Sequence, residues 1–213
     1  PFDLEEVRTL GDDQRPRPRR FTVRHWNPET QKLTIDFVTH GDQGYAGTWA
    51  QRAQIGDRLQ FKGPNGSYKP DIEADWHLLA GDESALSAIS ASVESIPENK
   101  ACSVFLIVDG PENRIDFASS PHHKINWIYR SAVPNPETAL LEAIRSHAFE
   151  DGKFDVFIHG EAGEVRDIRK YLILEHQIEI ESASISPYWR RDHTDEAWRS
   201  IKKQWLAEQE MDT

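Results

Sequence analysis

Two cations and a hydroxyl share one side of a short segment near the start of the chain. Arg20, Thr22 and Arg24 occupy alternate positions, with Phe21 and Val23 between them. In an extended strand this alternation places the polar and the apolar side chains on opposite faces. A flavin needs a cation for its pyrophosphate and a hydroxyl or amide near its redox nitrogen, so the segment suits such a cofactor. By itself, the pattern is explained more simply by a barrel strand with an exposed polar face.

Two glycine-rich segments lie where a predicted strand leads into a predicted helix. Residues 41–47 precede Thr48, and the amides at the start of a helix there would attract a phosphate. Residues 160–164 have the same placement, and Arg166 and Arg169 follow on the helix. An ordinary turn and a solvated helix face are the simpler interpretations of these two segments. Neither segment identifies a ligand by itself.

The histidines and the cysteine do not have the spacing of a metal site. The chain has 9 His and 1 Cys, but no HExxH sequence, and His122 and His123 are adjacent and do not converge easily on one ion. Cys102 lies in an apolar run. Because it is the single cysteine of the sequence, no disulfide or CxxC site can form within one chain. A GxSxG nucleophile turn is also absent. We therefore expect no bound metal and no hydrolase chemistry.

The first third of the chain has the pattern of an antiparallel β domain. Residues 21–25, 33–37 and 58–62 alternate apolar and polar side chains, and glycine and proline separate them. Several short strands between such turns predict a small antiparallel barrel or sandwich over residues 1–74.

The remaining residues, 75–213, have the pattern of an α/β domain. Apolar runs at 77–81, 104–108, 125–129, 156–158 and 178–185 alternate with segments of helical spacing, and a final helix begins after Thr194. The alternation predicts a mostly parallel sheet covered on both faces. The expected fold class is therefore two-domain α+β, with a β-barrel followed by an α/β domain. Ligands on such sheets bind beyond the carboxyl ends of the strands.

Charge and hydropathy exclude several partners. A net charge of -11 repels nucleic acid and anionic lipid, and no run approaches the ~20 apolar residues that span a bilayer. The first residues lack the basic and apolar regions of a signal peptide. Together with the single cysteine, these features favour the cytoplasm, and two packed domains favour a monomer.

Taken in order, several segments resemble the siderophore-interacting proteins, the FAD-dependent ferric-siderophore reductases of bacteria in the ferredoxin-reductase-like superfamily. The resemblance covers nearly the whole chain. It rests on residues 20–24, His40-Gly41 before Thr48-Trp49-Ala50, Gly56-Asp57, residues 63–68, residues 80–86, residues 160–163 with Arg166 and Arg169, and residues 188–191.

The resemblance implies an FAD-binding barrel followed by an NAD(P)H-binding α/β domain. It implies that Arg20 holds the flavin pyrophosphate, that Phe21 lies against the ring, and that Thr22 bonds near N5. The family usually has Tyr at Phe21, and commonly Pro and Ser where Tyr45 and Gly47 stand. The other positions that it places around FAD are Val23, His40, Gly41, Gly47, Thr48, Trp49 and Ala50.

The resemblance also assigns roles in the second domain. The flavin edge and the nicotinamide would meet at Gly81, Asp82, Glu83 and Ser84. Glu161, Ala162 and Gly163 would form part of the pyridine-nucleotide site. Trp189 would be the aromatic ring that the nicotinamide displaces or approaches, so Thr22 and Trp189 are the expected catalytic residues.

The implied substrate is a ferric siderophore, reduced by NADH or NADPH so that Fe(II) is released without any protein ligand to iron. Because ferric siderophores are often anionic, we expect a basic pocket formed from Arg24, Lys62, Lys69, Arg130, Arg190 and Arg191, although each is also explained as a solvated surface charge. Two alternatives remain open. One is a general flavin reductase with another acceptor, and the other is a non-catalytic siderophore-binding module that has lost the flavin.

Overall fold

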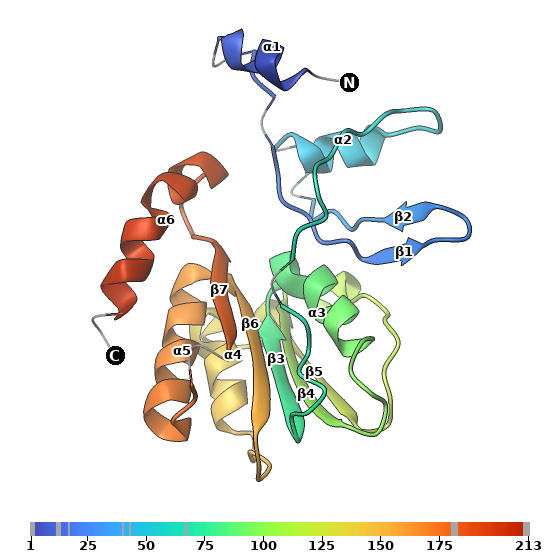
Figure 1. The fold of residues 1–213 in the computed structure, drawn as a ribbon. Coiled ribbons are helices and arrows are strands. Elements are labelled where there is room, and N and C mark those ends of the chain that lie inside the picture. Colours follow the sequence, from blue (N-terminus) through green and yellow to red (C-terminus); the bar gives the residue numbers. More distant parts are fainter. Residues whose placement is uncertain are drawn as a thin grey trace. The chain divides into compact units, whose positions relative to one another are not determined.

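The computed structural model describes residues 3–11, 14–16, 18–39, 41–42, 44–66, 68–179 and 183–210. The chain divides into two compact units, Pro1–Ser67 and Tyr68–Thr213 (Figure 1). This division lies before the expected boundary between Ala74 and Asp75. The intervening segment belongs to the second unit because the Tyr68 hydroxyl donates a hydrogen bond to Asp155 at 2.6 Å. The backbone N–H of Asp75 also donates to the Lys153 carbonyl at 2.8 Å.

The first unit contains a short antiparallel hairpin and two short helices. In the hairpin, Trp26 lies opposite Leu33. Asp3 caps the first helix by accepting a hydrogen bond from the backbone N–H of Glu5 at 2.8 Å, which satisfies one of the unpaired amides at a helix start. The elements are α1 (Leu4–Thr9), β1 (His25–Asn27), β2 (Lys32–Thr34) and α2 (Ala46–Arg52).

The described part of the first unit does not form the expected barrel. Its sheet has two strands, and residues 58–62, which have the alternation of a strand, pair with no other strand and are exposed throughout. Phe21, Leu59 and Phe61 are 43%, 48% and 62% exposed. No described side chain of this unit is buried, so the described residues enclose no barrel interior. Period-2 alternation identifies segments that can form strands, but a barrel also requires partners for each of them.

The second unit is built on a five-stranded sheet in which every neighbouring pair is parallel. The strand order is β5-β4-β3-β6-β7, so the chain first builds outward from β3 on one side and then on the other (Figure 1). This confirms the predicted parallel sheet. The strands are β3 (Trp76–Gly81), β4 (Ala101–Val108), β5 (His123–Tyr129), β6 (Phe154–Glu161) and β7 (Ser184–Trp189).

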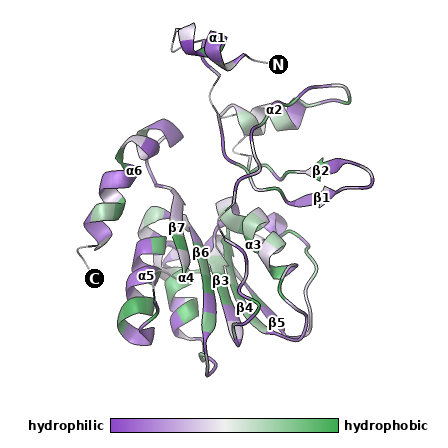
Figure 2. Ribbon diagram, in the orientation of Figure 1, coloured by the Kyte–Doolittle hydropathy of each residue, from purple (hydrophilic) through white to green (hydrophobic). Residues whose placement is uncertain are grey.

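Helices cover both faces of this sheet, and each strand alternates its side chains between two apolar cores. Leu78, Phe105 and Ile158 face α4 and α5, whereas Leu79 and Leu106 face α3. Figure 2 shows the hydrophobic colour concentrated on the strands. Burial on both faces is what makes these strands near-continuous apolar runs. The helices are η1 (Glu83–Ala85), α3 (Leu86–Val93), η2 (Pro111–Asn113), η3 (Arg130–Ala132), α4 (Pro136–Arg145), α5 (Ala162–His176) and α6 (Asp195–Glu210).

The carboxyl-terminal helix α6 docks beside β7. The Lys202 ammonium donates a hydrogen bond to the carbonyl of Pro187 at 2.6 Å. Trp198 is 2% exposed and packs edge-to-face against Trp205, with ring centroids 5.4 Å apart. Residues 194 onward therefore form the predicted helix, which is held to the edge strand of the sheet.

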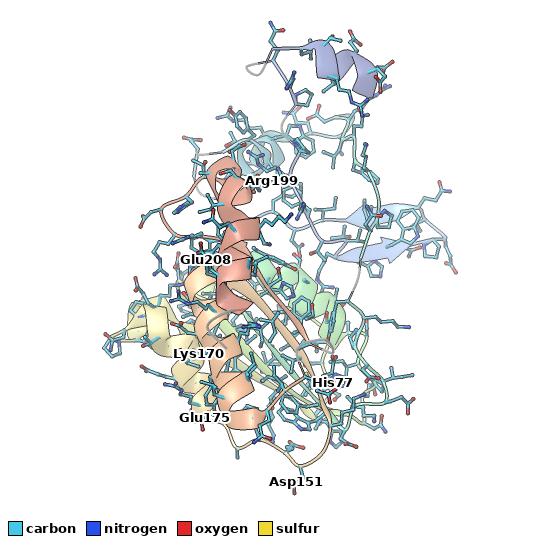
Figure 3. The ribbon with its side chains drawn as sticks, turned by 60° about the vertical axis from the view of Figure 1, so that its left-hand side comes forward. His77, Asp151, Lys170, Glu175, Arg199 and Glu208 are labelled. Atoms are coloured by element: carbon cyan, nitrogen blue, oxygen red, sulfur yellow. The ribbon has the colours of Figure 1, made fainter. Side chains whose placement is uncertain are left out.

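A buried polar group interrupts the core near the amino ends of the strands. Nδ1 of the fully buried His77 lies 3.3 Å from Oδ2 of Asp155. Figure 3 shows His77 toward the same end of the sheet as the turn that carries Asp151. Cys102 is the in-register neighbour of His77 on β4, and burial raises the pKa of its thiol to about 12. The thiol is therefore protonated at neutral pH and is not a nucleophile.

Candidate functional site

The segments that follow β3, β6 and β7 meet at the carboxyl edge of the sheet. Because these three strands are adjacent and parallel, their ends place Asp82, Glu161 and Trp189 together. Glu161 and Trp189 are register partners on neighbouring strands. The structure thus unites three predicted site residues from widely separated parts of the sequence, at the edge where ligands of parallel sheets bind.

Asp82 is the buried centre of this group. Its Oδ1 accepts hydrogen bonds from the backbone N–H of Ser84 at 2.9 Å and from the Ser84 hydroxyl at 2.5 Å. Its Oδ2 accepts from the backbone N–H of Glu161 at 2.8 Å and from the indole Nε1–H of Trp189 at 2.7 Å. Burial raises the pKa of Asp82, and the bonds from Ser84 and Trp189 act in the opposite direction. A side chain so placed organises the site rather than reaching outward from it.

Glu161 caps helix α5 with its own carboxylate. Oε2 accepts hydrogen bonds from the backbone N–H groups of Gly163 at 2.6 Å and Glu164 at 3.1 Å. Oε1 accepts from the backbone N–H of Arg191 at 3.1 Å. The amides that the glycine-rich segment would offer to a phosphate therefore bond to a protein carboxylate. The role of Glu161, Ala162 and Gly163 in nucleotide binding stays a prediction.

Glu164 is a site residue that the sequence analysis did not single out. It is 6% exposed, and burial followed by the nearby Asp82 raises the pKa of its carboxyl to about 7. Its Oε1 lies 3.3 Å from the Arg191 guanidinium, whereas its Oε2 has no hydrogen-bond partner among the described residues. The available signal was a second acid in the first turn of the predicted helix, three residues after Glu161.

The arginines at this edge are bound to carboxylates. Arg130 lies 2.5 Å from Glu83 and 3.1 Å from Asp109, which directly follows β4. Arg191 also lies 2.6 Å from Glu137 on α4. An anion that binds either guanidinium must therefore compete with acidic side chains.

Arg190 differs from these two arginines. Its guanidinium lies over the Trp205 ring, 6.0 Å from the centroid, and no carboxylate in the described part of the chain is within ion-pair distance of it. Arg190 is the half-buried cation at this edge that remains available to an anionic ligand.

The other predicted substrate cations are divided between the two units. Lys69 is exposed and lies beside Tyr68, which bonds to Asp155 at the start of β6, so it belongs to the amino edge of the sheet. Lys62 is exposed in the first unit. The Arg24 side chain is only 13% exposed, and its Nε lies 3.8 Å from Asp36. The six cations therefore do not form one basic pocket within either unit.

In the first unit, the predicted flavin residues lie on an open aromatic surface. The Phe21 ring packs against Phe37, with centroids 4.5 Å apart, and Phe37 lies 6.1 Å from Trp49. Phe21 and Val23 are exposed, whereas Thr22 is half-buried. The exposed polar face expected for this segment is found only at Arg20, because Thr22 and Arg24 are half-buried while Phe21 and Val23 are exposed.

Helix α2 carries the second set of predicted flavin residues, namely Gly47, Thr48, Trp49 and Ala50. The Thr48 hydroxyl donates to the Gly44 carbonyl at 2.8 Å, and Gly41 and Gly44 have φ of 59° and 82°. A Cβ on Gly47 would lie 3.1 Å from the Val38 carbonyl oxygen, so this turn packs too closely for a larger residue without a shift. His40, another predicted flavin contact, lies outside the described residues.

Two protein-family models match the chain. Residues 2–68 match the siderophore-interacting FAD-binding domain, and residues 74–192 match the siderophore-interacting protein model. The chain belongs to the siderophore-interacting protein family. The resemblance seen in the sequence is confirmed.

Individual relatives agree with this assignment. The chain is 40% identical over 223 residues to a Mycobacterium tuberculosis protein, Rv2895c, covering 100% of this chain and 78% of that protein. It is 37% identical over 198 residues to the ferric vibriobactin reductase ViuB of Vibrio cholerae, covering 91% of this chain and 72% of ViuB.

A solved structure has the same fold. The siderophore-interacting protein SipS from Aeromonas hydrophila superposes with a TM-score of 0.80 at 28% identity, covering 92% of this chain and 77% of SipS.

In the described ranges, no group of three or more His, Cys, Asp or Glu side chains is placed to hold a metal ion. None of the described helices is long and apolar enough to cross a membrane.

Proposed function

We propose that this chain is a flavoprotein reductase that passes electrons from NADH or NADPH to a ferric siderophore. The observation that carries the proposal is that one chain joins an FAD-binding domain to a parallel sheet with an aromatic ring at its carboxyl edge. Relatives named ferric vibriobactin reductase and ferric acinetobactin reductase support the choice of acceptor. We further infer that the protein acts as a cytoplasmic monomer.

The residues of the first unit fit FAD by the chemistry of their groups. Arg20 is an exposed cation, the aromatic residue Phe21 is 43% exposed, and Thr22 supplies a hydroxyl next to it. A dinucleotide flavin requires these three group types for its phosphates, its ring face and its polar ring edge. When bound, FAD supplies the exchange between a two-electron hydride donor and a one-electron ferric acceptor.

The chain would contribute binding and orientation to this reaction. Arg20 would hold the pyrophosphate, Phe21 would lie against the ring, and Thr22 would bond near the redox nitrogen. In the second unit, Trp189 exposes 38% of its surface and is available to stack on an aromatic ligand. Siderophores bind iron through hard oxygen donors, which hold Fe(II) more weakly than Fe(III), so reduction releases the metal.

The test is a visible absorption spectrum of the purified protein after reconstitution with FAD. NADH or NADPH is then added without oxygen, followed by a ferric siderophore. We expect flavin bands that bleach with at least one nucleotide and return as Fe(II) is trapped by a ferrous chelator. Bands that stay bleached would support the general flavin reductase. Failure to bind FAD would support the binding module. The acceptor control is a second ferric chelate that reoxidises the reduced flavin no faster than buffer alone does.

A further inference from the structure

The Asp82 carboxylate has no capacity left for a ligand. A carboxylate offers about four acceptor positions on its two oxygens, and Asp82 receives two hydrogen bonds on each. It is also 1% exposed. Asp82 therefore acts through the groups that it holds, which belong to Ser84, Glu161 and Trp189.

Two glycines make this arrangement possible. Gly160 has φ of 151°, and a Cβ there would lie 2.8 Å from Oδ2 of Asp82. A Cβ on Gly81 would lie within 2.8 Å of the Ala85 Cβ and closer still to the His159 carbonyl oxygen. Because any side chain at either position would push the strand ends apart, the close approach of β3 to β6 is built around Asp82.

The bond from Trp189 fixes one edge of an otherwise accessible ring. Its indole Nε1–H is held at 2.7 Å, while 38% of the residue stays exposed. Glu161 holds the backbone two residues later through Arg191. The chain is thus anchored both at Trp189 and immediately after it, which leaves the indole plane little freedom to turn.

We propose that Asp82 is a positioning residue that sets the orientation of the Trp189 indole for stacking on the aromatic ring of the pyridine nucleotide. The inference rests on the proposed function. It replaces the direct cofactor contact expected for Asp82 with an indirect role. A hydrogen bond to a buried carboxylate is among the stronger ones in proteins, and misplacing a stacked ring reduces the fraction of complexes with reactive geometry.

Two substitutions separate the bond from the ring. Trp189→Phe keeps an aromatic ring but removes the N–H donor, and it leaves Asp82 with three of its four donors. Asp82→Asn keeps the shape, but its amide nitrogen cannot accept, so it must give up either the Ser84 pair of bonds or the pair from Glu161 and Trp189. Asp151→Asn, in the exposed turn before β6, is the matched control for the loss of one carboxylate.

The first readout does not depend on activity. In the 15N-labelled protein, the indole N–H signal that disappears in Trp189→Phe belongs to Trp189. We expect this proton to exchange slowly with solvent in the wild type and in Asp151→Asn, and at least tenfold faster in Asp82→Ala, which offers the indole no acceptor in any orientation. Equal exchange in the wild type and Asp82→Ala would overturn the inference, whatever the protein is found to catalyse.

The second readout is the anaerobic rate of flavin bleaching in the reconstituted protein. We expect Asp82→Asn and Trp189→Phe each to lower the limiting rate roughly tenfold with little change in nucleotide affinity, and the double variant to be no slower than Asp82→Asn. If Asp82→Asn lowers the limiting bleaching rate while Trp189→Phe bleaches at the wild-type rate, the inference is overturned. If Trp189→Ala bleaches at the wild-type rate, the inference fails while the proposed function stands. If the wild type is not bleached by either nucleotide, the proposed function fails.

Discussion

The Tyr68 hydroxyl donates a 2.6 Å hydrogen bond to Oδ2 of Asp155, across 87 positions of the sequence. The same oxygen accepts the backbone N–H of Asp71 at 3.2 Å and faces Nδ1 of His77 at 3.3 Å. The Tyr68 ring packs on Phe157, with centroids 4.7 Å apart. One buried carboxylate on β6 therefore ties the segment that enters the second unit to the centre of the sheet.

We expect Tyr68→Phe to destabilise the second unit by about 2 kcal/mol, because it removes a hydrogen bond to a buried carboxylate while keeping the ring contact. Urea unfolding followed by far-UV circular dichroism measures the change. Tyr129→Phe is the control, since the Tyr129 hydroxyl receives only a 3.5 Å contact from Arg114. Equal midpoints for the two variants would show that the bond to Asp155 adds nothing to stability.

Glu164 predicts a pH dependence of stability. Its carboxyl has a pKa of about 7 in the folded protein against 4.5 ordinarily, because it is buried near Asp82. The folded state therefore holds a proton that the unfolded state releases between these values, so this group's stabilising contribution is complete below pH 4.5 and is lost as pH rises to about 7.

The variant Glu164→Gln lacks this titration. Relative to the wild type, we expect it to gain up to about 3 kcal/mol of stability between pH 5 and pH 8. Chemical unfolding at both pH values measures the gain. Glu175→Gln, an exposed carboxylate on the same helix, is the control and is expected to follow the wild type at both pH values. A Glu164→Gln curve parallel to the wild type would show that Glu164 has an ordinary pKa.

The second unit was predictable because its strands carry an unambiguous signal. Strands buried on both faces are apolar throughout, and the runs at 77–81, 104–108 and 156–158 each became a strand of the parallel sheet. Parallel strands also place their carboxyl ends at one edge, which agrees with the roles that the family resemblance implied for Asp82, Glu161 and Trp189.

The hydrogen-bond and ion-pair partners could not be predicted in the same way. Which donors reach Asp82 depends on side-chain geometry across strands 107 residues apart. The pairing of Arg130 with Asp109 likewise follows from the order of β3, β4 and β5, which the sequence does not specify. In the first unit, alternation predicted strand segments but not partners for them, so the described hairpin falls short of the expected barrel.

Arg190 is the cation at the carboxyl edge through which we expect an anionic ferric chelate to be recognised. Arg130 and Arg191 already bind carboxylates, whereas Arg190 packs on the Trp205 ring. Arg190→Glu should raise the apparent KM for an anionic chelate several-fold and leave the KM for a neutral chelate near the wild-type value. Steady-state reduction of both chelates measures this, with Lys170→Glu on the exposed face of α5 as the charge-matched control. Equal changes for the two chelates would exclude recognition of their charge by Arg190.

Arg20 is the exposed cation through which the first unit is expected to hold the FAD pyrophosphate. Arg20→Glu replaces an attraction to phosphate with a repulsion, so we expect FAD affinity to fall at least tenfold. Quenching of flavin fluorescence during titration of the apoprotein measures the affinity. Arg58→Glu changes the same charge at an exposed position of the same unit and is expected to bind FAD as the wild type does, which separates a local contact from the effect of net charge. If the two variants lose affinity equally, Arg20 makes no specific contact with the pyrophosphate, and the role that the family resemblance implies for it is wrong.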